Sequence, residues 1–159
     1  MSRRIPISPL SAHSFAPYGD VLAAEGAPDK LINDGKCRRF HDRAAFDFGD
    51  GGRAGLSIFH AELRALPYEF DLIERHPDGS QAFVAMSADP FLVIVSDGPA
   101  ARPKAFLTDG KQAINFHRAT WHGVLTPLSG SGIFAVIDRI GDSANLQEHR
   151  FDAPWVVVG

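Results

Sequence analysis

Glu74 and His76 stand two residues apart in the segment 68–86, YEFDLIERHPDGSQAFVAM. Alternate side chains of a strand share a face, so this segment should place both residues with the apolar Phe70 and Leu72. Because that face begins apolar, we expect it to point into the protein and to carry the carboxylate and imidazole inward. Buried groups of this kind are normally paired with each other, a metal or a ligand. The segment therefore predicts an interior polar site or, with equal weight, a satisfied polar network.

Two more polar side chains are expected to join this patch. If residues 77–80 form a four-residue hairpin loop, His76 and Gln81 stand opposite each other and point to the same side. In the later segment 120–125, TWHGVL, His122 and Trp121 fall on opposite faces, which makes His122 a candidate to point inward. Two histidines with carboxylate or amide oxygens on converging strands can hold a divalent metal, or can supply a general base and a hydrogen-bond donor without one.

The chain is of ordinary globular composition. Its 159 residues, 45% apolar and 22% charged, predict a single domain over 1–159. The net charge of −3 gives no support to nucleic-acid binding, and the single Cys37 excludes an internal disulfide and a thiolate metal cluster. No apolar run is long enough for a membrane span, and the start MSRRIPISPL has no secretory signal. We expect a cytoplasmic protein that binds neither membranes nor nucleic acid.

The elements that would position these side chains are short strands. Eight segments are rich in Val, Ile and Phe and lie between turn residues: 55–63, 68–76, 81–86, 91–95, 104–108, 113–116, 120–125 and 132–139. Strands at spacings of about ten residues are typical of an antiparallel sandwich or barrel. One short helix is expected between Ser8 and Phe15, and 23–52 should hold loops with one or two edge strands.

Several motifs together resemble one known family. They are Phe15–Val21, Asn33–Gly35, Arg39–Asp42, Glu74–Pro77, Gln81–Phe83, Asn115–Arg118, Trp121–His122 and Ile137–Arg139. These segments are similar to the ureidoglycolate lyases, formerly called ureidoglycolate hydrolases, and they cover nearly the whole chain. The resemblance implies an all-β fold, a cupin-type antiparallel barrel or jelly roll with one or two short helices, and a homodimer.

The resemblance also bears on a cofactor. Compared with the general metal-cupin pattern, Glu74 and His76 fall where two histidines are usual, Gln81 falls where a glutamate is usual, and His122 matches the distant histidine. A divalent metal such as nickel is described for the family, and these four residues would be its ligands.

The family reaction splits (S)-ureidoglycolate into glyoxylate and urea during allantoin and purine catabolism. The substrate hydroxyl loses a proton, the carbon–nitrogen bond breaks and urea leaves. We therefore expect His76 or His122 to act as the base, Glu74 to orient it or act as the acid, and Gln81 to hold the ureido group. The family chemistry also needs a cation for the substrate carboxylate, for which Lys104 and Arg139 are candidates; Arg75 is a weaker one, because alternation turns it away from Glu74 and His76.

Two rival hypotheses stay open at this point. One is a cupin enzyme that acts on another small acid, such as a dioxygenase or isomerase. The other is a barrel that binds or senses a small ligand without turning it over. A barrel fold by itself does not separate these functions.

Overall fold

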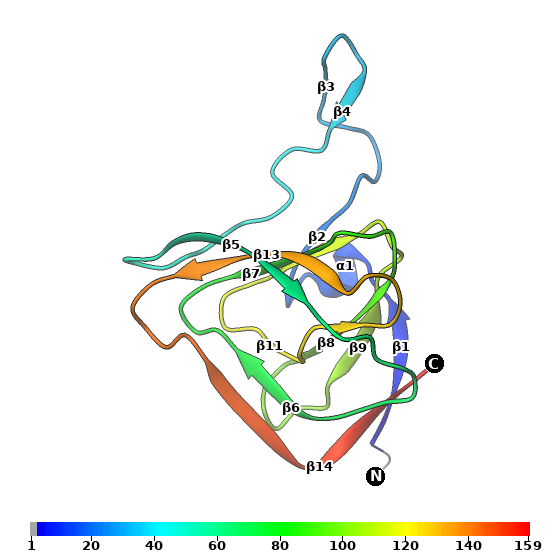
Figure 1. Ribbon diagram of the computed structural model, residues 1–159, viewed down its shortest axis with the longest axis vertical. Coiled ribbons are helices and arrows are strands. Elements are labelled where there is room, and N and C mark those ends of the chain that lie inside the picture. Colours follow the sequence, from blue (N-terminus) through cyan, green and yellow to red (C-terminus); the bar gives the residue numbers. More distant parts are fainter. Residues whose placement is uncertain (1–2) are drawn as a thin grey trace.

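A computed structural model describes residues 3–159, which form strands and one short helix (Figure 1). The elements in chain order are β1 (Arg4–Pro9), α1 (Ala12–Phe15), β2 (Gly19–Leu22), β3 (Lys30–Ile32), β4 (Cys37–Arg39), β5 (Arg53–His60), β6 (Tyr68–Arg75), β7 (Gln81–Ala85), β8 (Phe91–Ser96), β9 (Lys104–Leu107), β10 (Ala113–Phe116), β11 (Trp121–His122), β12 (Thr126–Pro127), β13 (Ile133–Ile140) and β14 (Gln147–Val158). The predicted all-β fold is confirmed. Within the described residues, no helix is long and apolar enough to cross a membrane.

The strands form two large sheets and one small hairpin. The first sheet has the order β11-β6-β14-β1-β9-β8-β12, and β11 pairs with β8 as well as with β6, so six of its strands close into a barrel. The second sheet has the order β2-β10-β7-β13-β5. The β3–β4 hairpin projects away from both sheets (Figure 1).

Two apolar cores share the strands of the first sheet. The first core lies between β8 and β9 of that sheet and β7, β10 and β13 of the second sheet. The second core is lined by β1, β6, β8, β9 and β14, all from the first sheet. Strand β8 divides its side chains between them: Val93 and Val95 enter the first core, while Leu92 and Ile94 enter the second. Burial on both faces explains why β8 is a continuous apolar run rather than an alternating one.

Most predicted strands are present. The sequence pattern did not indicate β1, β2 or the long β14, and the predicted strand 120–125 is reduced to the two-residue β11, with β12 beginning only after it. β1 occupies part of the segment expected to begin the helix, which starts only at Ala12, with the side chain of Ser11 as its N-cap. Strand β1 also runs parallel to both β14 and β9, so the first sheet is mixed rather than purely antiparallel.

The expected hairpin between β6 and β7 is wrong. β6 pairs with β11 and β14 in the first sheet, whereas β7 pairs with β10 and β13 in the second. Residues 77–80 therefore cross from one sheet to the other. A short turn rich in Pro, Asp and Gly reverses the chain equally well between paired strands and between packed sheets, so its length does not identify the pairing.

The expected common face of β6 is also wrong. Phe70 and Ile73, three residues apart, both lie in the second core, so strict alternation is interrupted between them. The partner strand β14 shows why: it pairs with Phe70 through Trp155 but with Leu72 through Arg150, which leaves a large bulge. The break in the alternation of β6 lies beside this bulge of β14, and Glu74 is not on the face that begins with Phe70.

Candidate active site

Glu74, His76 and His122 form one cluster, which we call the triad. One ligand-type atom from each lies within 4.8 Å of the others. Glu74, the penultimate residue of β6, stands in register with His122 of β11, so their side chains share a face of the first sheet. His122 is also in register with Val95, a residue of the first core. The triad therefore lies at one end of the space between the two sheets.

Hydrogen bonds to backbone carbonyl groups determine the tautomer of both imidazoles. The Nδ1 atom of His76 lies 2.9 Å from the carbonyl oxygen of Asn145, and that of His122 lies 2.9 Å from the carbonyl oxygen of Gly123. A carbonyl oxygen only accepts, so Nδ1 carries the proton in each neutral ring and Nε2 keeps a lone pair. Both Nε2 atoms are buried and have no hydrogen-bond partner within residues 3–159.

Aromatic contacts hold the His122 ring in place. Phe116 of β10 stacks on it with ring centroids 4.3 Å apart and an angle of 6° between the planes. The His76 ring lies 5.2 Å from the His122 ring on a tilted plane. Gly19 of β2 is in register with Phe116, and a Cβ atom at Gly19 would lie 2.0 Å from the carbonyl oxygen of Asn115. Only a glycine at position 19 lets β2 come close enough to β10 to pair with it at Phe116.

Burial shifts the ionisation of the triad in two directions. Burial lowers the pKa of His122 to about 4, although its hydrogen bond to Gly123 opposes the shift, and the charge of His76 lowers it further. Burial raises the pKa of Glu74; the neighbouring His76 opposes this change, and Glu148 adds to it. At neutral pH His122 is therefore an uncharged imidazole that can accept a hydrogen bond or bind a cation through Nε2.

The donor set of the triad fits a divalent metal. Two imidazole nitrogens and one carboxylate converge, and each histidine has its other nitrogen bonded to a backbone carbonyl, the arrangement typical of metal-bound histidine. The same groups can instead bind a small polar molecule, because the buried Nε2 atoms accept hydrogen bonds. The residues Glu74, His76 and His122 thus form a possible metal-binding triad.

Gln81, the fourth predicted site residue, lies on the facing sheet. It is in register with Phe116, the residue that stacks on His122, and its side chain is 7% exposed. Its Nε2 donates to Asp138 Oδ2 at 3.1 Å, while its Oε1 is buried without a partner within the described chain. The structure therefore places Gln81 beside the triad but gives it a separate partner.

Lys104 and Arg139, the predicted carboxylate-binding residues, have other partners. The Nζ atom of Lys104 donates to Tyr18 Oη at 2.7 Å and lies 3.7 Å from Asp97 Oδ2. Arg139 donates from Nε to the carbonyl oxygen of Phe48 at 2.7 Å, and its other bonds also go to neutral acceptors. Arg75 lies 4.8 Å from the Trp121 ring and so, as expected, points away from the triad.

Sequence analysis missed three residues that shape the site: Phe116, Asn145 and Asp138. Phe116 and Asp138 belong to the motifs NFHR and IDR, which carry the family resemblance, but in each motif the neighbouring basic residues are the more obvious candidates for chemistry. Alternation along 132–139 would have placed Asp138 on the face opposite Arg139. No local signal marks Asn145, because its role comes from a backbone carbonyl.

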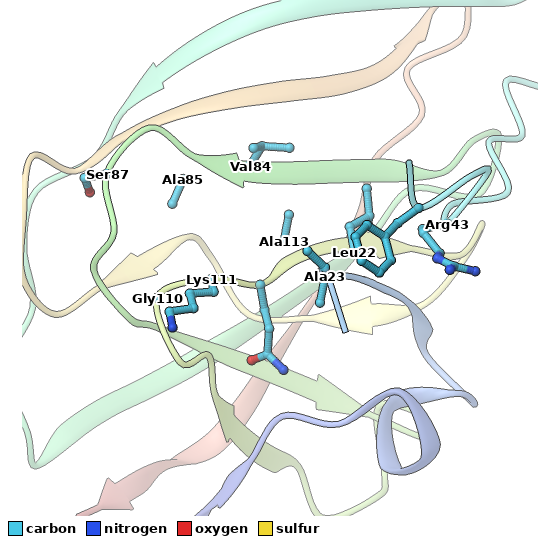
Figure 2. A pocket seen from close by; sticks show the side chains of 12 residues that line it. Leu22, Ala23, Arg43, Val84, Ala85, Ser87, Gly110, Lys111 and Ala113 are labelled. Atoms are coloured by element: carbon cyan, nitrogen blue, oxygen red, sulfur yellow. The ribbon is translucent and has the colours of Figure 1, made fainter. Parts of the chain in front are cut away.

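A separate cavity of about 490 Å³ lies at the other end of the same strands (Figure 2). It is lined by Val84 and Ala85 of β7 and by Ala113 of β10, among others, together with Arg43 (Figure 2). The Gln81–Phe116 pair marks the triad end of β7 and β10. The cavity therefore has no part in the triad.

Fold and site together define a cupin-type β-barrel with two histidines and one carboxylate converging between its sheets. Comparison with known proteins identifies the family: the chain belongs to the ureidoglycolate lyase family, whose pattern it matches over residues 2–158. A ureidoglycolate lyase of Rhodobacter capsulatus is 51% identical, over 98% of this chain and 99% of the relative. One from Chelativorans sp. is 42% identical (98% and 96% covered), and ureidoglycolate lyase 2 of Rhizobium meliloti is 43% identical (96% and 96% covered).

The buried neutral His122 predicts a loss of stability in acid. Between pH 6.5 and about 4 the unfolded chain takes up a proton at this residue and the folded chain does not, so the unfolding free energy falls as the pH falls. The contribution is about 3 kcal/mol across that window, at 1.36 kcal/mol for each pKa unit. Urea unfolding of chelator-treated protein at several pH values should show this slope, and His122→Asn should reduce it.

An exposed histidine on the helix provides the control. His13→Asn should keep the wild-type slope. An unchanged slope in His122→Asn would mean that the His122 ring is not held neutral by burial.

Proposed function

We propose that this protein is a ureidoglycolate lyase that splits (S)-ureidoglycolate into glyoxylate and urea. The observation that carries the proposal is the convergence of the Glu74 carboxylate with two buried imidazole nitrogens that have no partner among the described residues 3–159, in a chain that matches this family over residues 2–158. An unsatisfied buried polar atom costs about 1–3 kcal/mol. Groups of this kind at one point favour a binding site over a structural network.

The triad residues suit an elimination. A base takes the proton of the substrate hydroxyl, its oxygen forms a carbonyl with the carbon, the carbon–nitrogen bond breaks, and the departing nitrogen takes a proton to give urea. We assign the base to His76, whose Nε2 keeps its lone pair. Glu74 is the acid, because burial raises the pKa of its carboxyl toward the range in which it can donate a proton. The low pKa of His122 makes it a weaker base, suited to holding a ligand.

We further propose that the triad holds a divalent metal, nickel being the candidate. Glu74, His76 and His122 would be the ligands, and the Oε1 atom of Gln81 would stay available to the substrate. A bound cation would polarise the substrate hydroxyl and lower its pKa. In that case His76 would serve as a ligand and would not be the base.

For the substrate carboxylate, Lys104 shares the face of the first sheet that carries His122, whereas Arg139 lies on the face of β13 opposite Asp138. Arg139 lines a cavity of about 640 Å³ together with Asp78, two residues after His76. Its hydrogen bonds to neutral acceptors do not compensate its charge. Val95 of β8 is in register with both His122 of β11 and Lys104 of β9, so Lys104 lies two strands away from His122 across the first sheet. Lys104 already contacts Asp97.

Product analysis tests the activity directly. Purified protein with ureidoglycolate should release glyoxylate and urea in equal amounts, and the S enantiomer should be the substrate. Glyoxylate, urea and ammonia are assayed separately. Ammonia in place of urea would identify a hydrolase, and no turnover of either enantiomer with metal supplied would favour a binding or sensing role.

Variants of the triad test the assigned roles and the metal together. His76→Ala and His122→Ala should each lower kcat/KM by roughly 10²-fold or more while the circular dichroism spectrum stays that of the wild type. Metal content by mass spectrometry should fall from one ion per chain in both variants. His149→Ala, outside the triad, should keep activity and metal. Wild-type rates in His76→Ala and His122→Ala would contradict the assignment, and an active chelated wild type would contradict the metal.

We also propose that the protein is a homodimer that forms through the outer face of the second sheet. Leu56 and Ile58 lie on the edge strand β5 and are 72% and 61% exposed. Exposed apolar residues that gather on one edge mark an interface.

The exposed free thiol of Cys37 also supports a cytoplasmic location, where thiols stay reduced.

Sedimentation velocity tests the dimer. Wild-type protein should sediment at twice the chain mass, and the double variant Leu56→Asp, Ile58→Asp should sediment as a monomer. Leu66→Asp, at an exposed leucine outside that sheet, should remain dimeric. A monomeric wild type would contradict the proposal.

A further inference from the structure

The inner face of the second sheet carries another polar pair beside the triad. Gln81 of β7 is in register with Asp138 of β13 on one side and with Phe116 of β10 on the other. Residues in register share a face of a sheet, and Phe116 belongs to the first core, so all three point into the space between the sheets. The Phe116 ring stacks on His122. The Gln81–Asp138 pair is therefore separated from the triad by one aromatic ring.

The carboxylate decides which way the Gln81 amide points. The two side chains meet at 3.1 Å between Gln81 Nε2 and Asp138 Oδ2. An ionised carboxylate accepts hydrogen bonds and cannot donate one, so the NH₂ group of the amide must face it. The carbonyl oxygen, Oε1, is then directed away from Asp138. An uncharged amide at 138 would accept either orientation of Gln81.

The carbonyl oxygen so directed has no partner. Gln81 Oε1 is buried without a hydrogen bond to residues 3–159, in a side chain that is 7% exposed. A buried carbonyl oxygen without a donor is unfavourable, and a ligand that supplies an N–H or O–H group relieves it. The chemistry that fits is a hydrogen-bond donor on a ligand that lies near the triad.

We propose that Asp138 is a positioning and specificity-determining residue, which orients the Gln81 amide so that its carbonyl oxygen accepts a hydrogen bond from the ureido N–H groups of the substrate. This inference rests on the proposed function and names the group that separates a ureido substrate from other small hydroxy acids. A site built to accept from an N–H group rejects a ligand that lacks it, because the carbonyl then stays buried and unpaired.

Asp138→Asn tests this role with a nearly isosteric change. The new amide can donate to Gln81 Oε1, so Gln81 can turn its NH₂ group toward the substrate. The KM for ureidoglycolate should rise roughly tenfold, the effect of losing one hydrogen bond, while kcat changes less than about threefold. Metal content and thermal stability should stay close to those of the wild type. If Asp138→Asn folds poorly, Asp138→Ala supplies the same comparison.

A double-mutant cycle separates positioning from a merely structural effect. Gln81→Leu should raise KM by a similar factor, and adding Asp138→Asn to it should cause no further change, because Asp138 acts only through the amide. Asp152→Asn, at an exposed carboxylate, is the matched control and should leave KM unchanged. Additive effects of the two substitutions, an unchanged KM in Asp138→Asn or loss of metal from it would each overturn the inference.

The two proposals fail in different ways. A wild-type protein that makes no glyoxylate and urea overturns the proposed function and this inference with it. An active wild type whose Asp138→Asn variant has the same KM overturns the inference alone.

Discussion

The double pairing of β11 is the interaction on which the rest of the structure depends. This two-residue strand is in register with β6 through His122 and Glu74, and with β8 through Trp121 and Ser96 and through His122 and Val95. It closes the barrel, and in the same step it aligns His122 with Glu74. Trp121 packs against the second core while His122 faces the first. The pairing that closes the barrel therefore also brings His122 and Glu74 together.

The site exists because two packed cores support it. Buried polar atoms of His76, Gln81 and His122 have no hydrogen-bond partner among residues 3–159, and their combined cost is large beside the roughly 5–15 kcal/mol by which a typical domain is stable. The cores on either side of β8 offset that cost and hold the rings rigidly, as the stacking of Phe116 on His122 shows. A rigid site with unsatisfied acceptors is arranged for a ligand before the ligand arrives.

Much of the fold and part of the site could be predicted from local patterns. The strands rich in Val, Ile and Phe were found because alternation and turn residues act over a few positions. The motifs ERHP and WH identified the triad residues, although the argument for a common face of β6 was wrong. The alternation of β6 breaks beside the bulge that β14 forms between Arg150 and Trp155, and no feature of the segment 68–76 indicates that break. The sequence did not indicate β14, because the first half of this strand is charged and largely exposed although it pairs with β6.

The sequence by itself determined the all-β class, the family and the identity of Glu74, His76 and His122, because residue types and their short-range spacing are local properties. Only the tertiary structure decided which strands pair, that residues 77–80 cross between sheets rather than form a hairpin, and that Asp138 faces Gln81. It also decided the tautomers of the two histidines, through the backbone carbonyls of Asn145 and Gly123. Contacts between residues distant along the chain depend on how the two sheets pack together, and no local pattern encodes that packing.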